Sequence, residues 1–267
     1  MRSGTSTLAR WLGEHPQVYI APGKELHYFD RNFDQGLDWY RSLFAAAESE
    51  IQLGEATPNY LHETVAIDRM AATLPGAHLL VSLRNPVDRA YSHYWHNRSR
   101  DKEPLSFEKA LAAEPARTAS DETNRAFFSY GSRGHYLEQI LEVLRHFSRD
   151  ALHIEIAEEM QADPPSALKR IYRFLGVDDG FVPSMLEDKV NAYVEFRSVG
   201  LRNATKRLPR VLARPLNRLN ARTNQEYPPM DPGTRRQLEA RYEADNRRLR
   251  HFLGRDELWP MNSANPR

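Results

Sequence analysis

The chain contains no cysteine among its 267 residues. This absence excludes disulfides and thiolate metal sites. It is typical of a protein from a reducing compartment, so we expect a cytoplasmic location. No apolar run approaches the ~20 residues that a membrane-spanning helix needs, so no integral membrane segment is expected. No signal peptide is visible, and the abrupt start at Met1 leaves open a missing N-terminal segment.

An excess of one charge sign is also lacking. Lys and Arg together number 37 and Asp and Glu 36, which gives a net charge of +1 and no case for nucleic-acid binding,. The cations are spread unevenly, because eight of them and no acid lie between Arg197 and Arg222. By default such a stretch is a solvated basic face. The length, with 40% hydrophobic and 27% charged residues, predicts one globular α/β domain, alone or with appendages,.

The Walker A spacing is absent, yet the chain opens with a loop suited to phosphate,. Residues 2–7 combine one arginine, one glycine and four hydroxyl side chains, and we expect a helix to follow from Leu8 to Leu12. The N–H groups and dipole of a first helical turn favour an anion, although an ordinary N-cap is the alternative. Such loops normally follow a buried strand. A chain that starts at Met1 is therefore expected to lack its central strand.

The clearest strand covers residues 78–83 and is apolar, as in parallel sheets buried on both faces,. It ends at Arg84-Asn85-Pro86, and proline favours the first turn of a helix that then carries Ser92,. A strand, a short polar turn and a helix place ligand-binding groups at the carboxyl edge of a sheet. We therefore single out Arg84 and Ser92; the alternative is that Arg84 only pairs with Asp88.

Apolar periodicity predicts further strands and helices in alternation, which indicates a parallel sheet with right-handed crossovers. The other strands are expected at residues 18–20, 51–55 and 152–156, and the other helices at 36–44, 66–74, 134–147, 165–175 and 233–253. Residues 101–133 are polar and irregular, with one helix near 107–112, and are interpreted as an insertion or mobile flap. Residues 197–232 form a basic segment interrupted by prolines,.

Charged and aromatic residues crowd together in Lys24-Glu25-Leu26-His27-Tyr28-Phe29. One interpretation is a surface turn followed by an aromatic core pair. The other is a carboxylate held near an anion site by an adjacent cation. The residues alone leave both open.

The order of these motifs resembles a known family. The hydroxyl-rich loop, Lys-Glu-x-His-Tyr-Phe, Arg-Asn-Pro-x-x-Arg-x-x-Ser and a late Tyr-Pro-x-Met-Asp-Pro follow one another as in sulfotransferases that use 3′-phosphoadenosine 5′-phosphosulfate. The bacterial members and the heparan sulfate N- and 3-O-sulfotransferase domains are most similar. The resemblance implies one P-loop-like domain over residues 1–267, with a central parallel β-sheet flanked by helices. It also implies an acceptor hydroxyl or amine, on a glycan, glycolipid or small molecule.

The resemblance implies roles for individual residues. The 5′-phosphosulfate would be bound by Arg2, Ser3, Gly4, Thr5, Ser6 and Thr7. The 3′-phosphate would be held by Arg84 and Ser92, in a clamp separate from that loop. A loop closing over the nucleotide would include Arg222, Thr223 and Asn224, within the basic segment. Glu25 matches the general base, while Gly54-Glu55-Ala56-Thr57-Pro58 lacks the lysine that relatives carry there.

Sulfuryl transfer resembles phosphoryl transfer, in which the protein positions the reactants and supplies electrostatic stabilisation. Arg2 stays charged, so we expect it to neutralise the departing phosphate without donating a proton. Glu25 is the expected base, with His27 second because histidine titrates near neutrality. No His/Asp cluster in the sequence argues for a metal, and we expect none to be required.

Two other functions remain open. A P-loop nucleotide kinase is disfavoured by the missing Walker lysine and by the lack of an acidic strand end for magnesium. A non-enzymatic adaptor would dock its basic segment on an acidic partner or membrane surface. The adaptor alternative leaves the occurrence of Arg84, Ser92 and Glu25 in these motifs unexplained.

Overall fold

The computed structural model is described here for residues 2–23, 25–184, 186, 194–196, 205, 216, 221–223 and 227–259. The strands are β1 (Val18–Ile20), β2 (Gln52–Gly54), β3 (Leu79–Leu83), β4 (Leu152–Ile156), β5 (Val194–Phe196) and β6 (Ala221–Thr223). The α-helices are α1 (Thr5–Gly13), α2 (Gly36–Ser42), α3 (Thr64–Thr73), α4 (Pro86–Arg98), α5 (Phe107–Ser120), α6 (Glu122–Phe128), α7 (Tyr136–Leu144), α8 (Ala157–Ala162), α9 (Pro164–Leu175) and α12 (Pro232–Leu253). Short 3₁₀ turns occur at Phe33–Gln35, Tyr60–His62, Ser132–Gly134 and Arg149–Ala151. No helix within these ranges is long and apolar enough to cross a membrane.

The α/β class with parallel strands is confirmed. β1 pairs with β2, and β3 pairs with β4 from Leu79 opposite Leu152 to Leu83 opposite Ile156, both in parallel. Among the described strands these ladders are separate two-stranded sheets, so the single central sheet that we expected is seen here as two pairs. The antiparallel pair of β5, just before the basic segment, and β6, within it, was not predicted. Most of that region, including residues 197–204 and 206–215, lies outside the described residues.

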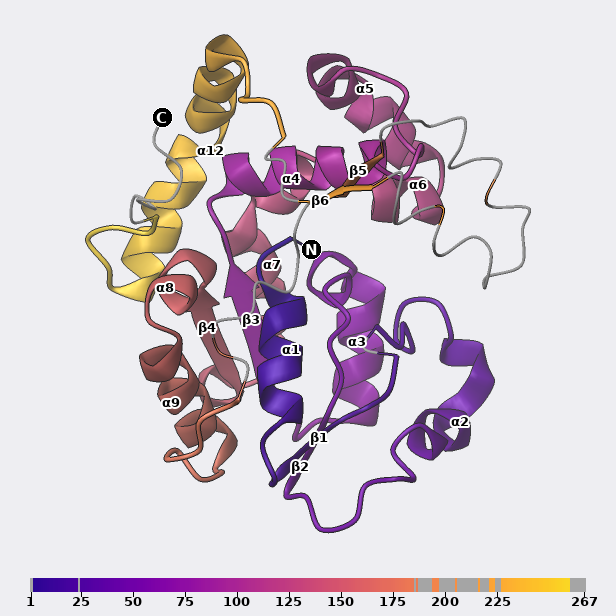
Figure 1. Cartoon of the computed structure of the whole chain (residues 1–267), viewed down its shortest axis with the longest axis vertical. Helices are drawn as coiled ribbons and strands as arrows, with labels where there is room; N and C mark the ends of the chain where they lie inside the picture. Colours follow the sequence, from indigo (N-terminus) through magenta and orange to yellow (C-terminus); the bar gives the residue numbers. More distant parts are fainter. Residues whose placement is uncertain are drawn as a thin grey trace.

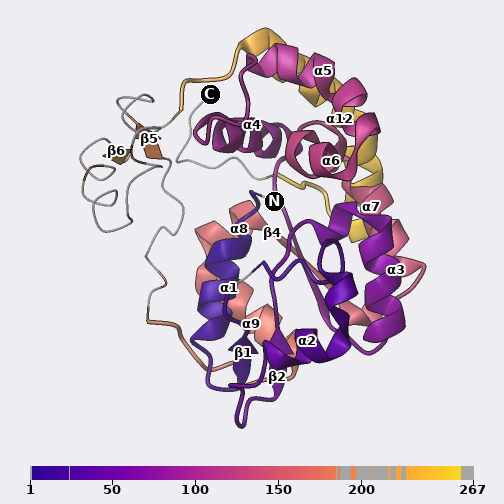
Figure 2. The same cartoon turned by 90° about the vertical axis from the view of Figure 1, so that its right-hand side faces the viewer.

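The alternation of side chains along β3 explains why helices cover both faces. Leu80 packs with the apolar cluster of α1 and α9, whereas Leu79, Val81 and Leu83 pack with the cluster of α3 and α7. Successive residues of a strand point to opposite faces, so an apolar run needs cover on both. Figure 2, turned by 90° from the view of Figure 1, shows α1 and α9 on one side of this pair and α3 and α7 on the other. This arrangement sets the N-terminal end of α1 beside the carboxyl end of β3.

Residues 101–133 are more regular than the sequence suggested. They form two helices, α5 and α6, in place of the one short helix that we expected near 107–112. Glu103 is only 2% exposed and accepts hydrogen bonds from Arg117 at 2.6 Å and from the Tyr130 hydroxyl at 2.9 Å. Polar side chains that the sequence suggested would lie on the surface thus find hydrogen-bond partners inside the fold. Whether this segment is an insertion stays a prediction.

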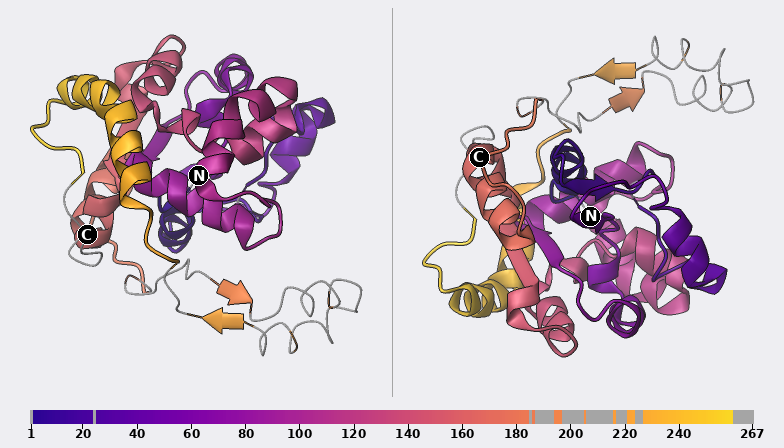
Figure 3. Two further views of the ribbon diagram at one scale, coloured as in Figure 1. Left: turned by 90° about the horizontal axis from the view of Figure 1, so that it is seen from above. Right: turned by 90° about the horizontal axis from the view of Figure 1, so that it is seen from below.

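Helix α4 crosses one end of the molecule and contacts α12, which returns the chain to the core (Figure 3). Asn85 caps α4, since its Oδ1 accepts from the N–H groups of Val87 at 3.0 Å and Asp88 at 3.3 Å, and Pro86 occupies the first helical position, as predicted,. The cap holds α4 directly after β3. Arg84 and Ser92 are thereby fixed on adjoining elements.

Candidate active site

The N-terminal loop is shorter than expected. Helix α1 begins at Thr5, so Thr5, Ser6 and Thr7 form its first turn and do not belong to a preceding loop. Its N-cap is Gly4, with a left-handed φ of 79° and no side-chain capping bond, so the ordinary hydroxyl cap is not what is found,. A Cβ at Gly4 would lie 2.9 Å from Cε of Met160. Glycine is therefore favoured by the left-handed conformation, and the terminal methyl of Met160 would have to shift to admit a Cβ.

Arg2, Ser92 and Arg84 meet at the carboxyl end of β3. Nε of Arg2 donates to Oγ of Ser92 at 3.0 Å, and Nη1 of Arg84 donates to the Arg2 carbonyl at 3.3 Å. Burial lowers the pKa of Arg2, and the nearby Arg84 and Arg100 guanidinium groups lower it further,. The loop and the Arg84/Ser92 pair, which we expected to act as separate clamps, are thus in direct contact.

His96 and Arg100 extend this cationic group, and the sequence analysis missed both. Nδ1 of His96 lies 3.4 Å from Nη1 of Arg2 and 2.8 Å from Nη1 of Arg100. Burial, followed by the Arg100 and Arg2 charges, lowers the pKa of His96 to about 4. His96 is therefore neutral at pH 7 and accepts from its cationic neighbours. Its position four residues beyond Ser92, one helical turn along α4, was the available signal,.

The backbone around Arg84 is held by buried partners. The Tyr136 hydroxyl donates to the Arg84 carbonyl at 2.8 Å, and the Asn85 N–H donates to Oε1 of Glu158 at 2.9 Å. Asp88, the alternative partner of Arg84, instead forms an ion pair with Arg235 at 2.5 Å. The Arg84 guanidinium is thus directed to the N-terminal loop and not to Asp88 of the following helix α4.

The loop after β1 supplies Glu25 and His27. His27 has a left-handed φ of 52°, and its Nδ1 lies 2.9 Å from Oδ2 of Asp30, while its Nε2 lies 3.7 Å from Oε2 of Glu25. The hydrogen bonds to Asp30 and then to Glu25 raise the pKa of His27 to about 9. His27 is an imidazolium at pH 7 and has no lone pair for a proton, so the geometry disfavours our second choice of base. Lys24 lies outside the described residues.

A buried relay anchors His27 from behind. The Asp30 side chain is fully buried, and its Oδ2 accepts from Nδ2 of Asn59 at 2.7 Å. Oδ1 of Asn59 in turn accepts from the guanidinium of the buried Arg133. Asp30, Asn59 and Arg133 were not predicted as site residues. Asp30 has the local signal of standing three residues after His27, whereas Asn59 and Arg133 are distant in sequence.

A third carboxyl group, that of Glu55, interacts electrostatically with His27. Burial raises the pKa of Glu55, which accepts from the Thr57 hydroxyl at 2.5 Å and the Tyr60 hydroxyl at 2.6 Å. Thr57 Oγ1 also accepts from the His27 N–H at 3.2 Å. The segment that lacks the relatives' lysine therefore supports the His27 loop.

Glu25 links the His27 loop electrostatically to the cationic group around His96. Its carboxylate is among the charges that act on His96, opposing the effect of Arg2 and Arg100 on the pKa of His96. The Glu25 side chain is 39% exposed, so it is accessible to a ligand. A carboxylate beside a group of arginines, on loops at the ends of β1 and β3, can accept a proton next to a bound anion.

The third expected element is only partly described. Arg222 and Thr223 lie in β6, where Arg222 is opposite Glu195 and Thr223 opposite Val194. Asn224 lies outside the described residues. Further along, Tyr227 stacks on Trp95 with ring centroids 6.1 Å apart. Tyr227 also acts on the pKa of Arg2, so the chain returns to the site at this point.

A cavity of about 330 Å³ adjoins the relay. Its lining residues are Asp30, Arg31, Phe33, Asp34, Asn59, Arg69, Thr123 and Ala126. Arg69 is fixed there, because it donates to the Phe29 carbonyl at 2.9 Å and lies 4.5 Å above the Phe33 ring. The cavity is polar and bordered by α6. It offers room for a hydroxylated molecule next to Asp30.

Comparisons with known proteins agree with the motif order. Residues 1–199 match the family model described as sulfotransferase domain. The chain is 33% identical over 177 residues to heparan sulfate glucosamine 3-O-sulfotransferase 3A1 of Mus musculus, covering 66% of this chain and 44% of that relative. It is 31% identical over 262 residues to heparan sulfate glucosamine 3-O-sulfotransferase 6 of Homo sapiens, covering 97% and 71%. The chain thus spans less than half of the mouse relative.

A solved structure is similar over nearly the whole chain. The sulfotransferase from Alicyclobacillus acidocaldarius superposes with a TM-score of 0.74 at 28% identity, covering 96% of this chain and 93% of that one. The likeness extends beyond the residues matched by the family model.

Proposed function

The chain belongs to the sulfotransferase domain family, and from this premise we propose that it transfers a sulfuryl group from 3′-phosphoadenosine 5′-phosphosulfate to an acceptor hydroxyl or amine. The observation that carries this proposal is the meeting of Arg2, Ser92 and Arg84 beside Glu25. Cationic and hydroxyl donors at a helix N-terminus suit phosphate groups, and a neighbouring carboxylate suits proton removal.

The donor would be held at its two phosphate ends. The N–H groups in the first turn of α1, which follows Gly4, suit the 5′-phosphosulfate,. The hydroxyls of Thr5, Ser6 and Thr7 lie in this first helical turn. Arg84 and Ser92 suit the 3′-phosphate, with Arg222, Thr223 and Asn224 proposed to close over the nucleotide. Arg2 belongs to the N-terminal loop and also contacts Ser92, so it can reach both phosphate ends of the donor.

In the transfer step, charge develops on the phosphate oxygen that leaves the sulfur. Arg2 is placed to stabilise this charge, because a planar guanidinium binds phosphate oxygens at two points and stays protonated. The reacting groups are otherwise positioned by the fold. No proton donation by Arg2 is needed.

The acceptor must lose a proton as it attacks, and Glu25 is the proposed base. His27 is better suited to position Glu25 than to replace it, since Asp30 keeps it charged and its Nε2 faces the Glu25 carboxylate at 3.7 Å. Asp30 acts through His27 and is a positioning residue. General-base assistance of this kind contributes about 10²–10⁴ in rate.

The acceptor is proposed to be a carbohydrate or a similar hydroxylated molecule that reaches Glu25 from the cavity beside Asp30. Two relatives are named as heparan sulfate glucosamine sulfotransferases, which is the basis for preferring a sugar. Arg31 and Arg69 border the cavity and suit polar or anionic substituents,.

The test combines binding and turnover. Calorimetry should show adenosine 3′,5′-bisphosphate binding without magnesium. Labelled donor should transfer its sulfur label to heparan sulfate, or to a component of a glycan and glycolipid extract. Glu25→Gln should reduce turnover at least about 10²-fold with nucleotide affinity nearly unchanged. The matched control is Asp38→Asn, an exposed carboxylate of α2 that does not line the cavity.

The absence of binding heat would refute the donor assignment. A strict magnesium requirement would favour a kinase, and unchanged turnover in Glu25→Gln would remove Glu25 from the reaction.

A further inference from the structure

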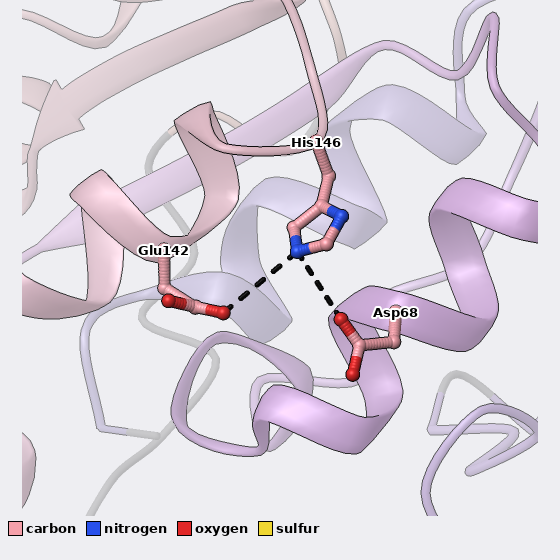
Figure 4. A group of neighbouring side chains, drawn as sticks. All are labelled: Asp68, Glu142 and His146. Atoms are coloured by element: carbon pink, nitrogen blue, oxygen red, sulfur yellow. Dashed lines mark ion pairs between the residues drawn. The ribbon is translucent and has the colours of Figure 1, made fainter.

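Three potential metal ligands meet on the surface between α3 and α7. Figure 4 shows Asp68 of α3, Glu142 of α7 and His146, two residues beyond the end of α7. Nε2 of His146 lies 3.1 Å from Oδ1 of Asp68 and 3.7 Å from Oε1 of Glu142. One donor atom from each residue lies within 4.8 Å of the other two. No other such group of three occurs in the described part of the chain.

The backbone behind this cluster is well anchored. Ile67, next to Asp68, is 1% exposed, and Val143, next to Glu142, is 2% exposed; both belong to the same apolar cluster. The two helices are thus packed at the cluster's base. Glu142 and His146 are four residues apart, the spacing that places two side chains on one helical face.

Side-chain contacts also direct the donors. Arg145 donates to Oε2 of Glu142 at 3.0 Å, while Oε1 of Glu142 is the atom nearest His146. The cluster follows the C-terminal end of α7, where the helix dipole favours a cation. One imidazole nitrogen and two carboxylate oxygens thus lie within 4.8 Å of one another.

The donor set fits a divalent transition-metal ion. Zinc binds histidine nitrogen and carboxylate oxygen at about 2.0–2.2 Å, so the ligands of a tetrahedral site stand about 3.3–3.6 Å apart. The His146 distances to Asp68 and Glu142 fall on either side of that range. Imidazole favours zinc-like ions over magnesium, which prefers an all-oxygen shell.

The competing description is a surface cluster of polar contacts between His146 and its two carboxylates without a metal. His153 also contacts a carboxylate, that of Glu155, but both oxygens of Glu155 already accept hydrogen bonds from Arg170, at 3.0 and 2.8 Å. At the Asp68 cluster, Arg145 occupies the outer oxygen of Glu142. The inner oxygen can therefore coordinate a metal.

We propose that Asp68, Glu142 and His146 bind one zinc-like divalent cation that ties α3 to the end of α7, with water as the fourth ligand. The site shares no residue with the sulfuryl-transfer site and does not depend on that assignment. Sequence inspection found no such cluster, because Asp68 is far from Glu142 along the chain.

The experiment uses the full chain without a histidine tag, freed of metal by chelator. Calorimetry with zinc chloride should show one equivalent bound, and His146→Gln, Glu142→Gln and Asp68→Asn should each weaken binding at least about tenfold, since even the outer partners of metal ligands contribute about 10–100-fold. The matched control is His251→Gln, an exposed histidine of α12. At a hundredfold excess over the Kd, zinc should raise Tm by about 5–10 °C.

Two results would overturn the proposal. One is the absence of stoichiometric zinc binding to the wild type. The other is the same loss of affinity in His251→Gln as in His146→Gln. Because Tm and calorimetry require no turnover, the outcome is independent of the sulfotransferase assay.

Discussion

Replacing Asp30 by asparagine tests the charge state of His27. Oδ1 and Oδ2 of Asp30 lie 3.0 and 2.9 Å from Nδ1 of His27, and the two side chains are 0% and 20% exposed. Asparagine keeps the size of the side chain and the contact with Asn59 but removes the charge. The substitution should therefore lower the pKa of His27 toward its ordinary value, with only Glu25 left to raise it.

The size of the effect follows from linkage. A rise of the His27 pKa from 6.5 to about 9 corresponds, at 1.36 kcal/mol per pKa unit, to about 3 kcal/mol of stability,. Because the folded-state pKa is raised, this contribution is fully present below pH 6.5 and is lost as the pH rises through about 9,. It amounts to about 2 kcal/mol at pH 7.5.

Two measurements check this reasoning. Histidine NMR should give a His27 pKa more than one unit lower in Asp30→Asn than in the wild type. Urea unfolding should show a stability difference between the two proteins that narrows by about 2 kcal/mol from pH 6 to pH 10. Asp34→Asn serves as the control. A wild-type His27 pKa near 6.5, together with a pH-independent stability difference, would refute the proposed pairing.

The remaining predictions concern the donor site. Arg84→Ala should weaken adenosine 3′,5′-bisphosphate binding by about tenfold or more, because a hydrogen bond to a charged group contributes about 1.5–3 kcal/mol, and should barely affect adenosine 5′-phosphate. Equal losses for both nucleotides in calorimetry would make Arg84 structural. Gly4→Ala should lower the free energy of unfolding by at least about 1 kcal/mol, because a left-handed backbone disfavours a Cβ and Met160 crowds it,; an unchanged Tm would contradict this. Arg2→Met should reduce turnover about 10²–10³-fold, whereas Arg2→Lys should retain most of the turnover. Steady-state assays that give the same turnover for Arg2→Met and Arg2→Lys would exclude charge stabilisation by Arg2.

Local patterns were sufficient for much of the fold. The apolar runs of β3 and β4 and the periodic faces of α7 and α9 predicted these elements closely, because each pattern is completed within one segment. Gly176, left-handed at φ 69°, ends α9 close to the expected boundary at residue 175,. The helices of residues 101–133 were less visible, since Glu103 is satisfied by Arg117 and Tyr130 only after folding.

The candidate site was predictable to the extent that its residues stand in short motifs. Arg84, Ser92 and Glu25 belong to such motifs, and their roles stay proposals. The contacts of Asp30 with Asn59, and of Asn59 with Arg133, join distant segments and leave no local pattern. The elevated pKa of His27 depends on these contacts, which is why histidine looked like a usable base from sequence alone.

The hydrogen bond from Arg2 to Ser92 has a consequence for nucleotide exchange. A ligand phosphate that accepts from Nε of Arg2 competes with the Ser92 hydroxyl oxygen, an acceptor already supplied by the protein. Binding is then a substitution, in which a neutral acceptor is replaced by an anionic one, so the net gain is smaller than the new contacts suggest. Under the proposed function, the Ser92 hydroxyl accepts from Arg2 again when the bisphosphate leaves, and this favours rapid release of the spent nucleotide.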